Sequence, residues 1–319
     1  MPATVVGRDA HLDVPLTNMA VKAFQGRGEF IGQKLFPVIN VQKQSNKYYT
    51  LDKNSWLLVP DTARAPKTAP RRVEFKVSSE NYFCPNYALA NENALEDLAN
   101  ADIALSLRKN SVSVVMDGLL RDLEVRIANQ VTSLTNLGSG VTLSGTSQWS
   151  DFTNSDPIAD VTTGHAFIQN NTGLMANTMV MDKDTFAVVR RHPILLDMFK
   201  YTSGGRVKLD QLADVFDVDT ILIARGIKNT ANENATGVIA NIWGNNVILC
   251  RIEPGTSLET QTFGLSFRWA PAGLPAAMQV QRYRDPDPGK AVEVVSTGYY
   301  QDEKIIAADL AYGIASTIA

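Results

Sequence analysis

The strongest pattern along the chain is a run of apolar positions at helical spacing between residues 106 and 136. The apolar side chains recur every three or four residues, as they do on one face of an α-helix. They are Val112, Met116, Leu119, Leu123, Ile127, Val131 and Leu134. Asp122 stands four residues before Arg126, which is the favoured order of an acid and a base on a helix. The pattern predicts a single helix over 106–136, roughly 46 Å long at 1.5 Å per residue. Such a length is typical of a structural spine.

Upstream of this helix the pattern becomes β-like. Residues 47–51 and 73–77 are rich in aromatic and branched side chains, and the second segment alternates strictly. Three prolines lie between the two segments and mark the tip of a long two-stranded loop: Pro60, Pro66 and Pro70. Strands of about a dozen residues would give a hairpin roughly 40 Å long. Because an isolated hairpin is barely stable in water, we expect this one to rest on another surface.

Downstream, helix and strand signals alternate. Asp156 as cap and Pro157 as first residue predict a helix over 157–170. The other predicted elements are strands at 178–181, 220–224 and 246–250, a helix opened by Asp184, a helix boundary or helix start at Pro193, and a helix over 209–216. Strands return at 278–283 and 291–300, and a last strand or short helix covers 305–314.

Two shorter segments complete this reading. Asn93 followed by Glu96 resembles a capping box and predicts a short helix before the long one. Residues 139–156 are rich in Gly, Ser, Thr and Asn and predict a loop.

These elements predict an α+β protein with five parts. They are an N-terminal arm (1–29), an extended β-hairpin loop with its base (30–90), a lobe built on the long helix with the loop that follows it (91–156), an α/β lobe (157–272), and strands that return to the first lobe (273–319). The second and last parts would complete a lobe that is discontinuous in sequence.

Composition narrows the class of protein. The 319 residues are 45% hydrophobic and 20% charged, with a net charge of −3, which excludes a disordered chain and a global basic field. No run approaches the roughly eighteen apolar residues of a membrane span. Two cysteines are too few for a disulfide framework, so we expect a reducing cytoplasm.

The charge is unevenly distributed along the chain. Residues 1–80 carry twelve Lys or Arg against seven Asp or Glu. A basic extension and an acidic remainder suit a subunit that wraps onto copies of itself, although a solvated hairpin of mixed charge explains the counts equally well. The candidate contact residues of the loop are Lys47, Tyr48, Tyr49, Trp56, Arg64, Lys67, Arg71 and Arg72.

Catalytic chemistry is sought and not found. The three histidines stand outside metal-ligand spacing, and no nucleophile elbow, phosphate loop or dinucleotide fingerprint occurs. Asp182 and Asp184 could seat a cation, but a strand end followed by a helix cap explains them better. His192 fits a helix end better than a general base. We therefore predict no catalytic, cofactor-binding or metal-binding residue.

Two other features have plain structural explanations. Residues 285–289 read Asp-Pro-Asp-Pro-Gly, like half of a calcium loop, but the closing glutamate is missing and a hairpin turn explains them. Cys84 and Cys250 have aromatic or apolar neighbours and are expected to be inert core thiols.

Several segments, taken in order, resemble the major capsid proteins of tailed phages. They are Phe30 to Val38 running into Lys47-Tyr48-Tyr49, the return through Arg64-Ala65-Pro66, Ser79 to Cys84 and Tyr87-Ala88, the helix entry Ala99 to Asp102, Asp156 to Val161, Asn177 to Met181, His192-Pro193 with Phe199-Lys200-Tyr201, and Trp243-Gly244-Asn245 before the strand 246–250. The resemblance covers roughly residues 30–315.

This resemblance implies the Hong Kong 97-type capsid fold, with an arm, an extended loop, a peripheral lobe containing a spine helix and an axial α/β lobe. In that family the loop lies over an adjacent subunit, and axial lobes meet at the centres of pentamers and hexamers. The shell is icosahedral and encloses double-stranded DNA, which we expect to be contacted without sequence specificity. The implied partners are copies of the chain, a portal protein and possible decoration proteins, in a virion assembled in the bacterial cytoplasm.

Two departures from the family pattern qualify this. Some members carry a cleaved N-terminal scaffolding segment, whereas only twenty-nine residues precede the first motif here. This implies either a separate scaffolding protein or a chain in its processed form, and we expect the separate scaffolding protein. Some members crosslink a loop lysine, for which Lys43, Lys47, Lys53 and Lys67 qualify by location alone, and we expect no crosslink. The alternatives are a bacterial nanocompartment shell of the same fold, or an α/β hydrolase or metal enzyme using Asp182, Asp184 and His192.

Overall fold

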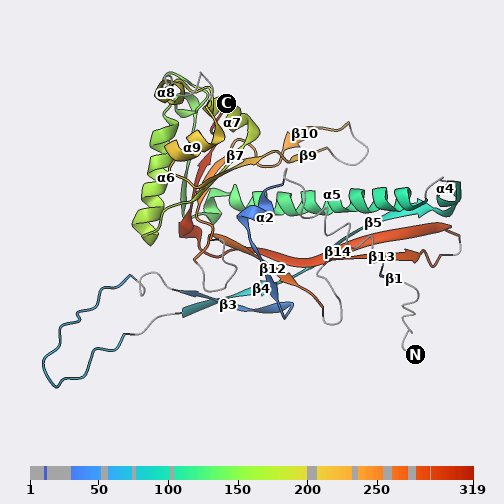
Figure 1. Ribbon diagram of the computed structural model, residues 1–319, viewed down its shortest axis with the longest axis horizontal. Coiled ribbons are helices and arrows are strands. Elements are labelled where there is room, and N and C mark those ends of the chain that lie inside the picture. Colours follow the sequence, from blue (N-terminus) through green and yellow to red (C-terminus); the bar gives the residue numbers. More distant parts are fainter. Residues whose placement is uncertain are drawn as a thin grey trace.

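The computed structural model describes residues 11–12, 30–51, 57–73, 77–100, 104–199, 207–231, 236–253, 261–271, 278–287 and 289–319. Figure 1 shows an elongated molecule in which one long helix runs above long strands, an α/β lobe stands at one end, and a β-hairpin with its loop extends beyond it. Within the described part of the chain, no helix combines the length and apolar character that crossing a bilayer requires.

A six-stranded sheet underlies the long helix. Its order is β1-β13-β14-β12-β2, with β5 pairing the first part of β14. The strands are β1 (His11–Leu12), β2 (Val38–Val41), β5 (Asn86–Ala94), β12 (Gly264–Trp269), β13 (Met278–Arg284) and β14 (Val292–Ile305). All pairings are antiparallel except that of β2 with β12. Strand β14 is fourteen residues long and pairs with β5, β12 and β13.

The predicted spine helix is observed as α5 (Ala104–Val131), which packs across β5 and β14. Six of its seven predicted apolar positions are buried. The predicted end at residue 136 is wrong, because Leu134 lies in the 3-10 turn η1 (Leu134–Asn136) and is only half-buried. The apolar period continues beyond the end of the helix. The backbone leaves the helix at Thr132, whose hydroxyl and N–H both donate to the Ala128 carbonyl.

A short helix, α4 (Leu95–Asn100), precedes α5. The capping box predicted for it is not formed, since Asn93 belongs to strand β5 and its Oδ1 accepts a hydrogen bond from the Ser111 hydroxyl. The sequence analysis missed β5. Its nine residues include three asparagines and one glutamate, which disfavour a strand locally.

The predicted hairpin is formed by β3 (Ser45–Leu51) and β4 (Val77–Phe83), paired from Ser45 opposite Phe83 to Leu51 opposite Val77. Each strand is described over seven residues. The predicted continuation of the hairpin to about a dozen residues and 40 Å falls on 52–56 and 74–76, which lie outside the described residues. The described part of the return strand runs from Val77 to Phe83, beyond the predicted end at residue 77, and residues 74–76 of the predicted strand lie outside the described residues. Residues 57–73 between the strands have no strand or helix and are called the loop tip below.

The second lobe is built on a five-stranded sheet of order β6-β15-β11-β7-β8. Its strands are β6 (Ser139–Thr142), β7 (Thr178–Asp182), β8 (Thr220–Ala224), β11 (Val247–Cys250) and β15 (Ala311–Ala315). The two central strands, β7 and β11, are buried along their whole length. We call this sheet with its helices the five-stranded lobe, and its upper end in Figure 1 carries α8.

The helices of this lobe follow the sequence pattern closely. They are α6 (Pro157–Thr172), α7 (Lys183–Val189), α8 (Pro193–Met198) and α9 (Leu209–Val215). Asp156 caps α6 as predicted, accepting hydrogen bonds from the N–H groups of Ile158 and Ala159. Helix α7 starts one residue before Asp184, and Asp182 is its cap. The remaining elements are α2 (Gly32–Leu35), β9 (Ile227–Asn229), β10 (Ile239–Asn241), η2 (Gly145–Ser147) and η3 (Ala308–Leu310).

The two sheets do not follow the predicted division of the chain at residue 272. Strand β12 lies before that boundary but pairs in the six-stranded sheet. Strand β15 lies after it but pairs with β11 and β6 in the five-stranded sheet. Strand β6 falls in the segment 139–156 that was predicted as a loop. The sheet that each strand joins is decided by pairing between distant segments, and the local sequence pattern does not reveal that pairing.

Candidate assembly surfaces and the joints that support them

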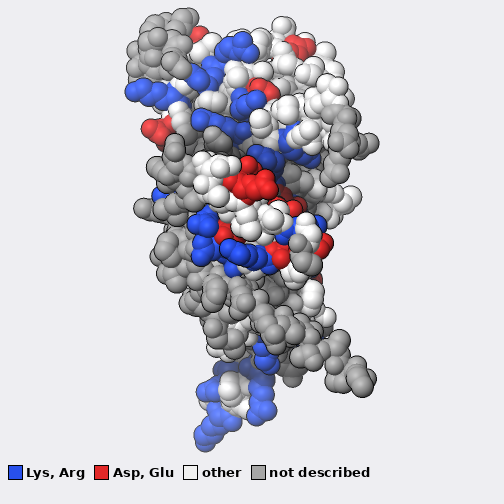
Figure 2. All heavy atoms as spheres, turned by 90° about the vertical axis from the view of Figure 1, so that its right-hand side faces the viewer, with Lys and Arg blue, Asp and Glu red and all other residues white. Residues whose placement is uncertain are grey.

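The loop tip is the most exposed part of the described chain. It begins with three apolar residues in succession, Leu57, Leu58 and Val59, which are 52%, 61% and 90% exposed. Four cations follow, Arg64, Lys67, Arg71 and Arg72, and all are exposed. Figure 2 shows this basic end at the foot of the molecule. Apolar and cationic groups thus stand together on a protruding segment that buries neither.

A tight turn shapes the tip. Pro66 and Lys67 are its central residues, and the Ala65 carbonyl accepts hydrogen bonds from both the N–H and the hydroxyl of Thr68. Lys67 has a φ of +63°. A positive φ is required at the third position of a type II turn, which commonly has proline at its second position. Lys67 is exposed at this turn.

The base of the hairpin is anchored by aromatic rings. Tyr82 stacks on Phe267 of β12 with centroids 4.6 Å apart, and Tyr48 lies 5.4 Å from the same ring. Tyr48 also donates a 2.5 Å hydrogen bond to Glu80, and burial followed by this bond raises its pKa. The interpretation of Tyr48 as a contact for a neighbour is wrong, because the side chain is buried in its own chain. Tyr49, one residue on, points to the opposite face and is 71% exposed.

An open groove of about 640 Å³ runs along the hairpin base. It is lined by Ser45, Asn46, Lys47, Asn81, Tyr82, Phe83, Pro85, Asp302 and Lys304. Asp302 accepts a 3.0 Å hydrogen bond from the Phe83 N–H and pairs with Lys304 at 3.6 Å. Of the predicted loop contacts, Lys47 borders this groove and is exposed, whereas Trp56 lies outside the described residues.

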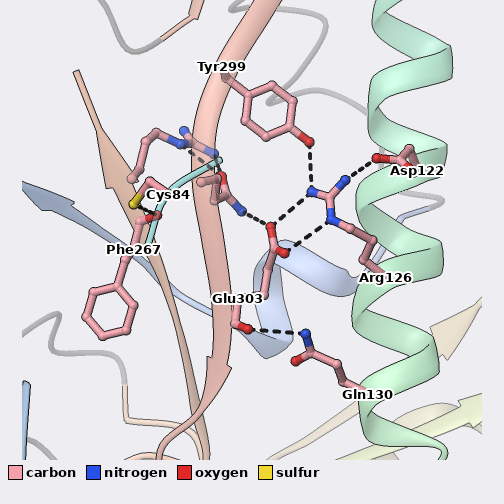
Figure 3. Close-up of polar contacts among 9 residues, drawn as sticks. Cys84, Asp122, Arg126, Gln130, Phe267, Tyr299 and Glu303 are labelled. Carbon is pink, nitrogen blue, oxygen red and sulfur yellow. Dashed lines mark hydrogen bonds and ion pairs between the residues drawn. The ribbon is translucent and has the colours of Figure 1, made fainter. Parts of the chain in front are cut away.

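Beneath the exposed surfaces, a buried ion pair joins α5 to β14 (Figure 3). Arg126 donates to both oxygens of Glu303, at 3.2 and 3.1 Å, and to the Tyr299 hydroxyl. It also pairs with Asp122 on its own helix and lies 3.6 Å from the centre of the Tyr87 ring. Burial alone would lower the pKa of Arg126, but Glu303 and Tyr299 raise it above its ordinary value. The arginine therefore stays charged and holds the register of helix on sheet.

The network continues across the sheet. Gln301 donates to Glu303 at 3.0 Å and accepts from Arg268 of β12. Gln130 on α5 donates to the Glu303 backbone carbonyl. Both carboxylate oxygens of Glu303 and its backbone carbonyl thus have partners, and a buried carboxylate requires such hydrogen bonds.

A second buried carboxylate, Glu124 on α5, connects three parts of the chain. It accepts hydrogen bonds from the N–H groups of Ile31 and Gly32 at 3.1 and 2.7 Å, and from the indole N–H of Trp243 at 2.6 Å. Burial raises the pKa of Glu124, and the three donors oppose the rise. Gly32 is required here, because a Cβ at this position would lie 2.7 Å from a carboxylate oxygen.

The residues of the enzyme alternative do not form one site. Asp182 and Asp184 are bridged by the side-chain amide of Asn241, at 3.0 and 2.7 Å. Asp182 caps α7 and accepts from the N–H of Asp184, which lies in the first turn. His192 is buried at the start of α8 and contacts Ser155. Among the described residues, no group of three His, Cys, Asp or Glu could hold a metal ion.

The two thiols are core groups. Cys84 donates to the Phe267 carbonyl, and burial raises its pKa to about 12. Burial likewise raises the pKa of Cys250. Both side chains are fully buried, as predicted.

The loop cations and the apolar face of the helix are predictable from the sequence, whereas the polar joints are not. Glu124 could have been recognised by its place four residues after Leu120 and three before Ile127, on the buried side of the helix. Its partners could not, because Trp243 is 119 positions away.

Comparison with known proteins identifies relatives of this chain. No protein-family model matches the chain. Two curated proteins do: the major capsid protein of Pseudomonas phage JBD67 is 26% identical over 263 residues, covering 81% of this chain and 83% of the relative. The major capsid protein of Burkholderia phage BcepMu is 26% identical over 244 residues, covering 76% of each.

Solved structures agree on the fold. A phage-related protein from Bordetella bronchiseptica superposes with a TM-score of 0.76 at 21% identity, covering 97% of this chain and 99% of its own. The capsid protein of cyanophage P-SCSP1u superposes with a TM-score of 0.56 at 12% identity, covering 90% and 88%. The α+β architecture described above is therefore the Hong Kong 97-type fold of phage capsids.

Proposed function

We propose that this chain, a tailed-phage major capsid protein by its relatives and its fold, assembles with copies of itself as pentamers and hexamers into an icosahedral head around double-stranded DNA. Its place in the virion is the capsid. Its relatives are structural shell proteins, and we propose no reaction for it. Assembly in the host cytoplasm is part of the proposal.

The observation that carries this proposal is the loop tip. Three apolar side chains and four cations protrude from the molecule, and no described residue pairs with those cations. A monomer gains nothing by exposing such a run. A neighbouring copy that covers it would bury the apolar groups and supply opposite charge.

The same chain offers surfaces of that opposite charge. Glu92, Glu96 and Asp97 are exposed at the end of α5 that lies away from the hairpin. Figure 2 faces that end and shows an acidic area over it. A contact between the loop-tip cations of one copy and these carboxylates of another would be head-to-tail, and such contacts close into rings when the rotation permits. Each contact can be modest, because a shell multiplies it by valency.

The other partners follow from the family resemblance. We propose a separate scaffolding protein, a portal protein and possible decoration proteins, with DNA contacted through its phosphates and without base readout. Base-specific protection in a footprint of the packaged DNA would contradict the last of these.

The test is removal of the tip. Replacing residues 58–70 with a short Gly-Ser linker should leave circular dichroism and the melting temperature of the protomer unchanged, because the anchoring rings of the hairpin base are kept. Closed particles should be lost in negative-stain images. A variant that loses the protomer fold, or one that still forms normal shells, would count against the proposal.

A further inference from the structure

His192 is a buried titratable group that lies outside the loop tip and the polar joints described above, and its surroundings favour one protonation state. The side chain is fully buried between the end of α7 and the start of α8. It occupies the N-cap position of α8, where its backbone carbonyl accepts a hydrogen bond from the Leu196 N–H. The ring of Phe152 packs edge-on against it, with centroids 5.6 Å apart.

The hydrogen bonds around the ring identify its tautomer. The Ser155 hydroxyl donates to the Asp151 carbonyl at 2.7 Å, so its one hydrogen is already used. The 3.1 Å contact between Ser155 Oγ and His192 Nε2 must then run from Nε2–H to the oxygen. This leaves Nδ1 as a bare acceptor, which is buried and has no hydrogen-bond partner.

A second proton would have to go on Nδ1, where no described acceptor awaits it. It would also lie at the N-terminal end of α8, where the helix dipole opposes positive charge. Of the groups around the ring, Asp156 at the start of α6 favours protonation. Asp151 precedes Ser155 in the facing segment, Arg190 and Arg191 come from the end of α7, and Asp197 lies on α8.

We propose that His192 makes the end of the five-stranded lobe acid-sensitive: protonation of the ring separates α8 from the segment 151–155. The charged ring cannot stay where Nδ1–H has no acceptor, and in water it is fully solvated. Its departure breaks the Ser155 contact and releases Phe152. Phe152, Ile194 and Met198 are already partly exposed here, so opening changes an apolar surface at the end of the lobe.

The direction of the pH dependence follows from the burial. Desolvation lowers the pKa of His192 below its ordinary value of 6.5, and Asp156 opposes this only in part. The unfolded or opened state therefore binds the proton first as the pH falls. The stability of the closed arrangement is complete above pH 6.5 and is lost as the pH falls from there.

The test is hydrogen–deuterium exchange of the full chain at pH 7.5 and pH 5.0, with rates corrected for intrinsic exchange. Peptides covering 148–156 and 192–199 should lose protection at pH 5.0, by up to about tenfold for each pH unit below 6.5, the ordinary pKa of the ring that opening restores. Peptides covering the buried strand β7 should not change. Because exchange is read on the chain itself, the result does not depend on whether a shell forms.

The variant His192→Gln retains an amide donor for Ser155 but cannot take a proton, so its protection should be the same at both pH values. The matched control is His165→Gln, which replaces the other buried histidine; its Nε2 lies 2.8 Å from the Phe216 carbonyl. This control should keep the acid response. Equal acid responses in the wild type and His192→Gln, or none in the wild type, would overturn the proposal.

A second variant keeps the test informative if His192→Gln does not fold. Ser155→Ala removes the acceptor for Nε2–H, which weakens the closed state with the neutral ring. Opening should then occur at a higher pH than in the wild type. An unchanged opening pH would overturn the proposal.

Discussion

The indole N–H of Trp243 donates a 2.6 Å hydrogen bond to Glu124, a residue in the C-terminal third of the long helix α5. The same carboxylate accepts from the backbone of Ile31 and Gly32, just before the segment that enters the hairpin. One buried side chain thus fixes the helix, the five-stranded lobe and the root of the extended loop relative to one another.

Replacing Glu124 should loosen this joint. In Glu124→Gln the amide nitrogen would face a backbone or indole N–H, leaving a buried donor unsatisfied at a cost of about 1–3 kcal/mol in the free energy of unfolding. Trp243→Phe removes one donor and should cost less. Urea unfolding of both single variants and of the double variant measures the coupling, and strictly additive effects would contradict the joint.

The difference in unfolding free energy between the wild type and Glu124→Gln should depend on pH, and the direction of this dependence can be stated. The pKa of Glu124 is raised above its ordinary value of 4.5, so its stabilising contribution is complete below pH 4.5 and is lost as the pH rises through the folded-state pKa. The advantage of the wild type over Glu124→Gln should therefore shrink as the pH is raised from 4.5. An advantage that grows with pH would show that the pKa is lowered instead.

The Arg126–Glu303 pair should be strongly coupled. Arg126→Ala leaves the buried Glu303 carboxylate without its cation, which typically costs about 3–5 kcal/mol. Replacing both residues with apolar ones of similar size, Arg126→Met with Glu303→Leu, should cost much less than the sum of the two single changes. Thermal unfolding of the three variants checks this, and additivity within about 0.5 kcal/mol would contradict it.

The local parts of the fold could be predicted from sequence, and the long-range pairings could not. The start of α6 follows from Asp156 and Pro157, because capping is a property of adjacent residues. The end of α5 was placed too late, since Leu134 continues the apolar period after the backbone has left the helix. Strand β5 was missed because its stability comes from pairing with β14, some two hundred positions later, and from α5 above it.

The candidate assembly surfaces and the joints beneath them were also predictable only in part. The loop cations were found because their exposure follows from charge and from the prolines between them. Tyr48 was assigned to the wrong face, since the face of a strand depends on its register, and Phe267 lies in a distant strand. The polar joints join residues more than ninety positions apart, and no local pattern records them.

One glycine tests the packing at the root of the hairpin. A Cβ on Gly264 would lie 2.5 Å from the Phe36 ring, so Gly264→Ala should cost about 1–3 kcal/mol in stability. Gly237→Ala is the matched control, because its Cβ would meet nothing closer than 3.6 Å. Adding Phe36→Leu to Gly264→Ala should recover part of the loss, and equal melting temperatures for the two glycine variants would contradict the packing described here.

The charges of the loop tip should act on assembly and not on the fold. Changing Arg64, Arg71 and Arg72 to glutamate should abolish closed particles and leave the unfolding midpoint within error, because all three side chains are exposed. Changing the same residues to lysine keeps the charge and should preserve the particles. Sedimentation velocity separates the two outcomes, and assembly of the glutamate variant would remove the electrostatic part of the account.

The most direct measurement is electron cryomicroscopy of the purified full chain. We expect closed icosahedral particles in which residues 57–73 of each copy lie against a neighbouring copy and Glu124 still contacts Trp243 within every subunit. A sample that stays monomeric at high concentration, with the loop tip in solvent or folded onto its own subunit, would contradict the central claim.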